Sequence, residues 1–350
     1  MRESIERNMA YLRAFFTGET DGHAIIMNAT EPGGCPLGDF TLSDRPVADW
    51  RDHVLRRYEA QLEWHERIGD DSVPYVVSTH ANTGIFAAAF GCPLHVYDTD
   101  TNAAATPAVN TADEADALPE PEIDDVPTLR RTLELARLAA EALGPEVPVA
   151  VPDVQSPFDI AAMVWRKEEF FIACATAPKP VRRLVAKCER LLVRFLDRYL
   201  AELPNVNMCH CPRAWSPPEL GIWLSEDEGG SISPATFEAL SLPSLTRLSE
   251  RYGGISIHCC ASAAHQFPSF RKLPGLRAWQ RVFADQGGPA TALKAWPDKP
   301  FVVAWTDERE VRELRQISPE TRFLVNMDAQ ETLEESLALY ARLRQVFPRK

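Results

Sequence analysis

Short apolar runs alternate along the chain with longer segments in which apolar residues recur every three or four positions. From residue 24 to the C-terminus, each short run is followed by a loop rich in Gly, Pro or Asp and then by a segment of helical period. This repetition is typical of βα units that build a parallel sheet. Eight runs predict strands, a number that suits a closed barrel: 24–28, 74–78, 147–153, 205–211, 255–260, 276–280, 301–305 and 322–327.

The segments between these runs predict an outer ring of helices. They place Leu, Val, Ala and Phe at three- and four-residue spacing, as expected for helices that pack on a sheet. The segment 232–254 has a candidate N-cap at Ser233, a proline directly after it, and a glycine pair at its end. The predicted helices are 47–68, 123–143, 178–202, 232–254 and 331–346. We therefore predict an α/β protein, a single-domain (β/α)8 TIM barrel over residues 1–350 that begins with a helical extension in 1–23.

Two inserts interrupt the repeating pattern. The segment 95–125 is acidic and rich in Ala, Thr and Pro, which predicts a surface excursion with little regular structure. The segment 212–231 follows the fourth predicted strand, and we expect it to lie as a loop over the C-terminal mouth of the barrel. No linker separates the chain into two domains.

Charge and cysteine content restrict the expected partners and compartment. The chain has 50 acidic and 37 basic residues and a net charge of −13, which disfavours nucleic acid and anionic membranes because both would repel it. No run of about 18 apolar residues is present, and charges stand throughout the N-terminal stretch where a signal peptide needs an apolar run. We expect a cytoplasmic protein. Its eight cysteines then predict reduced, mostly buried thiols, with metal binding as the next option.

The sharpest candidate chemistry stands at the end of the fifth predicted strand. Because side chains alternate along a strand, His258 and Cys260 are expected on one face and Cys259 on the other. Imidazole and thiolate are typical zinc ligands, and strand ends face the active-site mouth of a barrel. The alternative is that both residues pack in a core without metal. Cys209 and Cys211 share a face at the end of the fourth strand and are open to the same two interpretations.

Other polar and aromatic residues follow predicted strands at the same mouth. We assign His80 a catalytic role, and we assign substrate binding to Asn28, Asp153 and Trp305. Hydrogen bonding within the loops is the alternative role for each of them. The spacings of a phosphate-binding loop, a dinucleotide fold and a serine-hydrolase elbow are absent from the sequence.

Three longer stretches resemble the uroporphyrinogen decarboxylase superfamily. SPFDIAAMVWRKEEFFIACATAPKPVRRLVAKCERLL, at 156–192, is similar to its G-P-F…A-A-M…E-E-F…P-E-x-V-x-x-L segment. SEDEGGSISPATFEALSLPSLTRLSERYGGISIHCC, at 225–260, resembles its acidic turn, its I-S-P-E-x-F helix and its strand that ends in H-x-C-G. RFLVNMDAQETLEESLALYARLR, at 322–344, resembles its last strand and helix. The resemblance implies a (β/α)8 barrel and leaves several reactions open.

The resemblance also implies roles for particular residues. In the zinc-dependent corrinoid methyltransferases of the superfamily, the H-x-C pair binds zinc with a cysteine at the end of the last strand. Here that position holds Asn326-Met327-Asp328, so Asp328 is the expected third ligand beside His258 and Cys260. Cys209 and Cys211 are the alternative ligands. The superfamily also places a carboxylate of the acidic turn in the pocket, which makes Asp227 a catalytic candidate as ligand, proton donor or substrate orienter, with a solvated loop as the alternative.

Three functions compete on these grounds. The leading one is an enzyme, a zinc-dependent methyltransferase that moves a methyl group between a corrinoid on a partner protein and a thiol or related small substrate. The second is a metal-free decarboxylase or lyase for a small carboxylated substrate. Uroporphyrinogen itself is disfavoured because the first strand segment lacks the arginines that the superfamily places there. The third is a non-catalytic barrel that binds a small ligand. Homodimers are common among similar proteins, so a second copy of the chain is a candidate partner.

Overall fold

Two parallel sheets form the framework of the protein. The computed structural model describes residues 1–29, 37–38, 40, 42–77, 83–96, 103–281 and 288–350. The larger sheet has the order β1-β11-β10-β9-β8-β7, and the smaller has the order β2-β5-β6. Their bounds are β1 Ala24–Asn28, β2 Val76–Val77, β5 Val149–Ala150, β6 Val206–Asn207, β7 Ile222–Ser225, β8 Ile255–Cys259, β9 Leu276–Arg281, β10 Phe301–Val303 and β11 Phe323–Asp328. A separate antiparallel pair comprises β3 Leu94–Val96 and β4 Ala103–Ala105.

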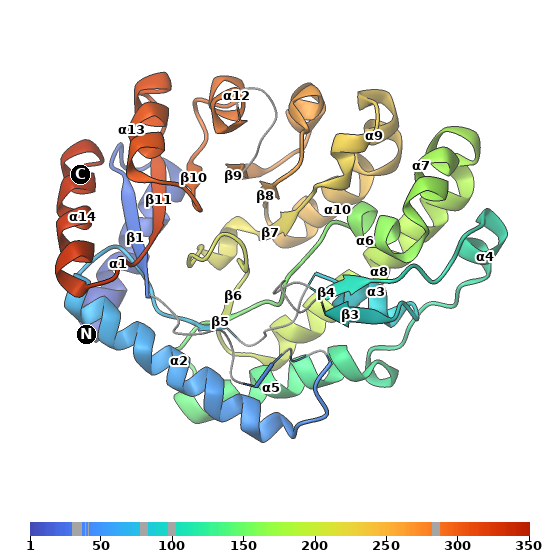
Figure 1. Ribbon diagram of the computed structural model, residues 1–350, viewed down its shortest axis with the longest axis horizontal. Helices are drawn as coiled ribbons and strands as arrows, with labels where there is room; N and C mark the ends of the chain where they lie inside the picture. The colour runs from blue at the N-terminus through green and yellow to red at the C-terminus, as the bar shows by residue number, and fades with distance from the viewer. Residues whose placement is uncertain (30–36, 39, 41, 78–82, 97–102, 282–287) are drawn as a thin grey trace.

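Hydrogen bonds link the two parallel sheets on one side through β7 and the residue after β6, and on the other through β1 and the segment that leads into β2. On one side, Trp223 N donates to Met208 O at 3.0 Å. On the other, Asp71 N donates to Ile25 O at 3.0 Å, and the Asp71 carboxylate accepts from Ile25 N at 2.8 Å. The strands therefore follow one another around a barrel with the helices outside them (Figure 1). The predicted α/β barrel class is confirmed, although the two sheets contain nine strands among the described residues, one more than predicted.

Strand β7 is a departure from the prediction, which placed its residues in the loop 212–231. All four residues of β7 are buried, and the strand pairs in parallel with β8, with Ser225 opposite His258. A fully buried strand shows no alternation of apolar and polar residues, so a run this short could not be distinguished from a loop by periodicity. As a consequence, the turn after β7 stands directly beside the end of β8.

The helices mostly follow the predicted ranges. Helix α2 spans the predicted 47–68, and Ser233 caps α9 as expected by accepting a hydrogen bond from Thr236 N at 3.2 Å. The predicted helix 232–254 is two helices, because Pro243 has no backbone N–H with which to continue the first. The helices are α1 Arg2–Thr17, α2 Val47–Ile68, α3 Ile85–Ala89, α4 Ala112–Ala117, α5 Pro127–Leu143, α6 Pro157–Val164, α7 Lys167–Thr176, α8 Pro178–Glu202, α9 Pro234–Leu240, α10 Leu242–Tyr252, α11 Phe267–Phe270, α12 Gly288–Ala295, α13 Glu308–Ile317 and α14 Leu333–Val346.

Helix α1 covers the N-terminal end of the barrel. Its Phe15 and Phe16 belong to a hydrophobic cluster with strand residues such as Ile26 and Leu324. The neighbouring strand residues belong to the main core instead, so this cluster lies on the inner face of the strands. Arg322, which precedes β11, donates to Phe15 O at 2.5 Å and fixes the helix there. The opposite, C-terminal ends of the strands remain for a functional site.

The insert 95–125 has more regular structure than predicted. It contains most of the β3–β4 pair and helix α4, where Thr111 and Glu114 form a capping box. Beyond α4 the insert lies along α8, where Arg190 pairs with Glu120 at 2.5 Å. A local cap and the cations of a neighbouring helix thus order a segment whose acidic composition suggested an irregular loop.

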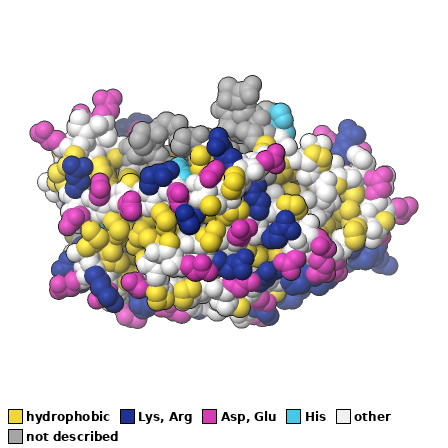
Figure 2. All heavy atoms as spheres, turned by 90° about the horizontal axis from the view of Figure 1, so that it is seen from below, with side chains coloured by type: hydrophobic (Ala, Val, Ile, Leu, Met, Phe, Trp, Pro, Cys, Tyr) yellow, Lys and Arg dark blue, Asp and Glu magenta, His cyan; other side chains and the backbone are white. Residues whose placement is uncertain are grey.

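Both signs of charge are present on the surface. In the view of Figure 2, acidic, basic and hydrophobic side chains are interspersed over the visible face. That face therefore lacks the single-sign field that would steer a highly charged partner. Within the part of the chain that the structure describes, every helix is too short or too polar to cross a membrane.

Candidate metal centre

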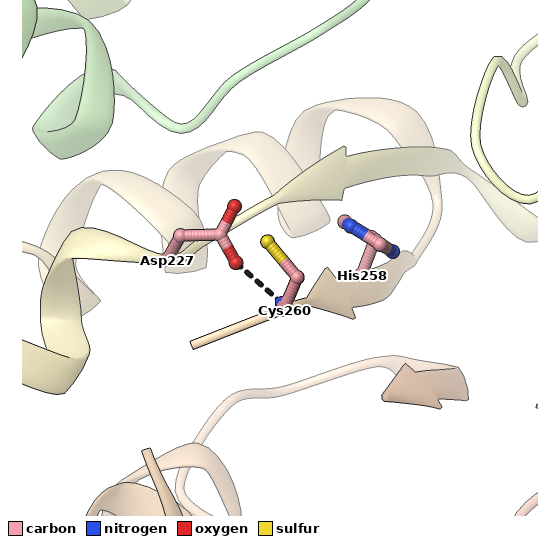
Figure 3. A group of neighbouring side chains, drawn as sticks. All are labelled: Asp227, His258 and Cys260. Carbon is pink, nitrogen blue, oxygen red and sulfur yellow. Dashed lines mark hydrogen bonds between the residues drawn. The ribbon is translucent and has the colours of Figure 1, made fainter. Parts of the chain in front are cut away.

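Three side chains with metal-binding atoms meet at the C-terminal ends of β7 and β8. One ligand atom from each of Asp227, His258 and Cys260 lies within 4.8 Å of the others, and Figure 3 shows the three side chains gathered there. Across the described ranges, this is the one such group of His, Cys, Asp or Glu residues. The strand ends belong to the C-terminal face of the barrel, where the active sites of barrel enzymes lie.

Strand geometry explains why these residues converge. His258 and Cys260 are two positions apart at the end of β8, so they face the same side, as predicted. Cys259 between them is 0% exposed and lies in the main core. Because Ser225 pairs with His258, the turn that follows β7 brings Asp227 level with Cys260.

Gln280 holds the ring of His258. Its Oε1 lies 3.0 Å from His258 Nδ1, and the two residues are register partners on β9 and β8. An amide oxygen can only accept, so this contact places the proton on Nδ1 and leaves Nε2 with a free electron pair. Burial lowers the pKa of His258, which keeps the ring neutral, the form that binds metals. Cys211 Sγ lies 3.5 Å from the same Nδ1.

Asp227 and Cys260 are tied to each other. Asp227 Oδ1 accepts a hydrogen bond from the backbone N–H of Cys260 at 2.6 Å (Figure 3). Cys260 is exposed as a residue, but its sulfur lies against this carboxylate. Burial of the thiol, the charge of Asp227 and a hydrogen bond to it raise the pKa of Cys260 to about 12. The thiol is therefore protonated at neutral pH unless a cation stabilises the thiolate.

The other predicted ligands lie outside this group. Asp328 ends β11, which β9 and β10 separate from β8 in the sheet, and its Oδ1 lies 3.4 Å from Asn28 Nδ2. Asp227 thus stands where we expected Asp328 to complete the set, because the adjacent strand β7 supplies the nearer carboxylate. Cys209 is buried and donates to Pro212 O at 3.2 Å. Cys211 contacts His258 without joining the group.

A second polar pair, Asp153 and His210, lies at the ends of the neighbouring strands. His210 Nε2 lies 2.7 Å from Asp153 Oδ1, and its Nδ1 accepts from Val154 N at 3.3 Å. Gln155 Nε2 also donates to Asp153 Oδ1 at 2.6 Å. Burial favours a higher pKa, but the charge of His210 and these hydrogen bonds hold the pKa of Asp153 below its usual value. Asp153 is thus a carboxylate near neutral pH, oriented by a histidine from the end of the next strand.

The remaining predicted site residues have different surroundings. Trp305 has a backbone φ of 55°, a 51% exposed side chain, and a ring that meets the His258 ring edge-on at 5.8 Å. A left-handed backbone is strained for a bulky residue and is common at functional positions. Asn28 donates to the side chain of Asn326 at the end of β11. His80 lies outside the described residues.

The sequence matches a family model over part of its length. The family model described as uroporphyrinogen decarboxylase (URO-D) matches residues 58–210. The resemblance to the uroporphyrinogen decarboxylase superfamily is thereby confirmed. The matched region of the superfamily ends before β7, so the candidate metal centre lies outside it. No curated protein matches the chain.

Solved structures include one with the same fold. A methyltransferase from Methanosarcina mazei is similar over 97% of this chain and 98% of its own, with a TM-score of 0.62 and 13% sequence identity, which shows a shared fold. The apo crystal structure of the homocysteine methyltransferase MmuM from Escherichia coli covers 65% of this chain and 91% of its own at 14% identity. Its TM-score of 0.24 is too low to support any conclusion.

Proposed function

We propose that this protein is a zinc-dependent methyltransferase that transfers a methyl group between a corrinoid on a partner protein and a small thiol. The observation that carries the proposal is the convergence of Asp227, His258 and Cys260 at the C-terminal ends of two adjacent barrel strands. The barrel shared with the Methanosarcina mazei methyltransferase makes methyl transfer the first reaction to test. The corrinoid partner rests on the superfamily resemblance.

The donor set fits zinc. Catalytic zinc sites use three protein ligands drawn from His, Cys and carboxylates and keep a further position open for substrate. Here the three donors are an imidazole nitrogen, a thiol sulfur and a carboxylate oxygen. Gln280 supplies the outer hydrogen bond that orients a metal-binding histidine. The high pKa of the Cys260 thiol is also the expected property of a ligand that a metal converts to thiolate.

The residues around this group are suited to substrate activation and substrate binding. Bound zinc would lower the pKa of a substrate thiol and stabilise its thiolate as the nucleophile for a methyl group. Trp305, half exposed beside His258, provides an apolar wall at the mouth. Asp153, held by His210 and Gln155, offers a fixed carboxylate that can hold a polar substrate group.

The test combines metal content with turnover. Purified protein, loaded with zinc, is incubated with methylcobalamin and a panel of small thiols, and thioether formation is followed by mass spectrometry. We expect methylation that needs zinc and disappears in His258→Ala and Cys260→Ala. Cys174→Ala, on α7 and far from the centre in sequence, is the control thiol variant and should retain activity. Turnover of no thiol by zinc-loaded protein, with either methylcobalamin or a methylated corrinoid protein, would refute the proposal.

The Asp153–His210 pair favours a second candidate function. A carboxylate and an imidazole in contact can move protons without a metal, as a decarboxylase or lyase of a small carboxylated substrate requires. This alternative predicts that the purified protein releases CO2 from such a substrate in the presence of a chelator. It also predicts that Asp153→Asn abolishes that activity while Cys260→Ala does not.

A further inference from the structure

Two buried carboxyl groups lie directly behind the candidate metal centre. Asp159, in the first turn of α6, is 2% exposed, and Glu226, directly after β7, is 0% exposed. The sequence singled out neither residue. Asp159 is part of a mostly apolar helix, and nothing in the sequence distinguishes Glu226 from the two acidic residues that follow it. Buried carboxyl groups are costly unless hydrogen bonds satisfy them, so their contacts indicate what they hold.

Both carboxyl groups bind the backbone of the turn that carries Asp227. Asp159 Oδ2 accepts from Asp227 N at 2.8 Å, and Asp159 Oδ1 accepts from Glu228 N at 2.9 Å. Glu226 Oε1 accepts from Gly229 N at 3.1 Å. Three consecutive amides of the turn are therefore held by carboxyl oxygens, and two of them by Asp159.

This arrangement sorts three consecutive acids into different environments. Glu226 points inward and accepts from Ser241 Oγ at 2.6 Å. Glu228 points outward and pairs with Lys167 Nζ at 2.5 Å. Asp227, between them, reaches the group with His258 and Cys260. A shift of the turn by one residue would put a different acid beside the cysteine, so the position of these amides decides which carboxylate faces the centre.

We propose that Asp159 is a positioning residue for the metal centre: by holding the amides of Asp227 and Glu228, it selects Asp227 as the carboxylate ligand beside His258 and Cys260. The part of this inference that concerns metal binding rests on the proposed function, whereas the role of Asp159 in placing the turn does not. Asp227 is then fixed twice, through its backbone by Asp159 and through its carboxylate by the N–H of Cys260. A ligand fixed in this way loses little conformational freedom when it binds a metal.

The test is Asp159→Asn, which keeps the size of the side chain but replaces one of its two acceptors with a donor. We expect affinity for Co²⁺, used as a spectroscopic substitute for zinc, to fall about 10- to 100-fold, as with other residues that orient metal ligands. The visible absorption of the bound Co²⁺ should change, because the carboxylate ligand is displaced. Hydrogen exchange of the peptide that covers 226–230 should become faster, since one of the two amides held by Asp159 loses its acceptor and faces an NH2 group instead.

The control is Ser233→Ala, which removes the N-cap of α9 just after the same turn without touching either carboxyl group. It should lower the melting temperature but leave Co²⁺ affinity and absorption unchanged, which separates positioning from stability. If Asp159→Asn does not fold, Asp159→Ser, which keeps one acceptor, takes its place. Wild-type Co²⁺ affinity and spectrum in the Asp159 variant would overturn the inference.

The metal-free readout separates this inference from the proposed function. If the wild-type protein binds no metal, the zinc proposal fails, and the role of Asp159 in placing Asp227 is decided by hydrogen exchange of the metal-free protein. Faster exchange of residues 226–230 in Asp159→Asn then supports the placement. Unchanged exchange overturns it.

Discussion

Gln280 gives the most discriminating prediction about the candidate centre. Replacing it with leucine keeps the side-chain volume similar but removes the acceptor that lies 3.0 Å from His258 Nδ1. The His258 ring then loses the contact that fixes its orientation and tautomer. Loss of such an outer hydrogen bond costs about 10- to 100-fold in metal affinity, which corresponds to about 1.4–2.7 kcal/mol.

The same change should have little effect on folding. Gln280 is fully buried and its Nε2 is, among the described residues, a buried donor without a hydrogen-bond partner. Gln280→Leu removes that unsatisfied donor while it leaves His258 Nδ1–H without its acceptor. Each unsatisfied buried group costs about 1–3 kcal/mol, so the two effects offset each other. We expect the stability of the metal-free protein to change by less than about 1 kcal/mol.

The assay measures zinc affinity by competition with a chromophoric chelator, and melting temperature in the metal-free state. Gln280→Glu is the matched variant, because its carboxylate keeps an acceptor for His258 Nδ1 and carboxylates commonly support metal-binding histidines. It should retain zinc affinity. If Gln280→Leu binds zinc as tightly as wild type while His258→Ala does not, His258 does not use Gln280 for orientation and the reasoning is refuted.

Further predictions concern Trp305, His23 and the acidic turn that carries Asp227. Trp305→Ala should reduce kcat/KM roughly 5- to 30-fold without loss of zinc, because it removes a substrate contact worth about 1–2 kcal/mol. Because φ of residue 305 is 55°, the Trp305→Gly protein should be more stable than the Trp305→Ala protein by about 1 kcal/mol in chemical denaturation. Burial, with nearby cations, lowers the pKa of His23 to about 4. The free energy of unfolding should therefore keep the full contribution of His23 above about pH 6.5 and fall by up to about 1.4 kcal/mol per pH unit as the pH drops toward 4. His23→Asn should flatten that part of a plot of unfolding free energy against pH, and an unchanged slope would contradict the argument. Asp227→Ala should abolish stoichiometric zinc binding, whereas Glu228→Ala, on the outward side of the same turn, should not, and equal loss in both would show that the turn does not select one acid.

The residue pattern was sufficient for the barrel and for two of the three residues of the candidate centre. The βα pattern predicted the strands, and the alternation along 255–260 predicted that His258 and Cys260 share a face. These are local properties, because strand period and helix period depend on residues a few positions apart. The superfamily resemblance added Asp227 as a candidate beside them.

The rest of the centre depends on which strands are neighbours. Asp227 reaches the pair because β7 is a sheet strand next to β8, whereas the sequence analysis left the residues of β7 within the loop 212–231. The expectation that Asp328 completes the ligand set came from the last strand, which is not adjacent to β8. Gln280 and Asp159 act through contacts between segments far apart in the chain, and neither has a local signal.

The identity of the ligands is the most direct test of the central claim. X-ray absorption of the zinc-loaded protein counts the sulfur and the nitrogen or oxygen atoms around the metal. We predict one zinc per chain with one sulfur, from Cys260, and with nitrogen and oxygen ligands from His258 and Asp227. Two protein sulfurs would contradict the predicted ligand set, because they would mean that Cys211 binds the metal in place of Asp227. Protein that takes up no zinc at all would contradict the whole account of the site.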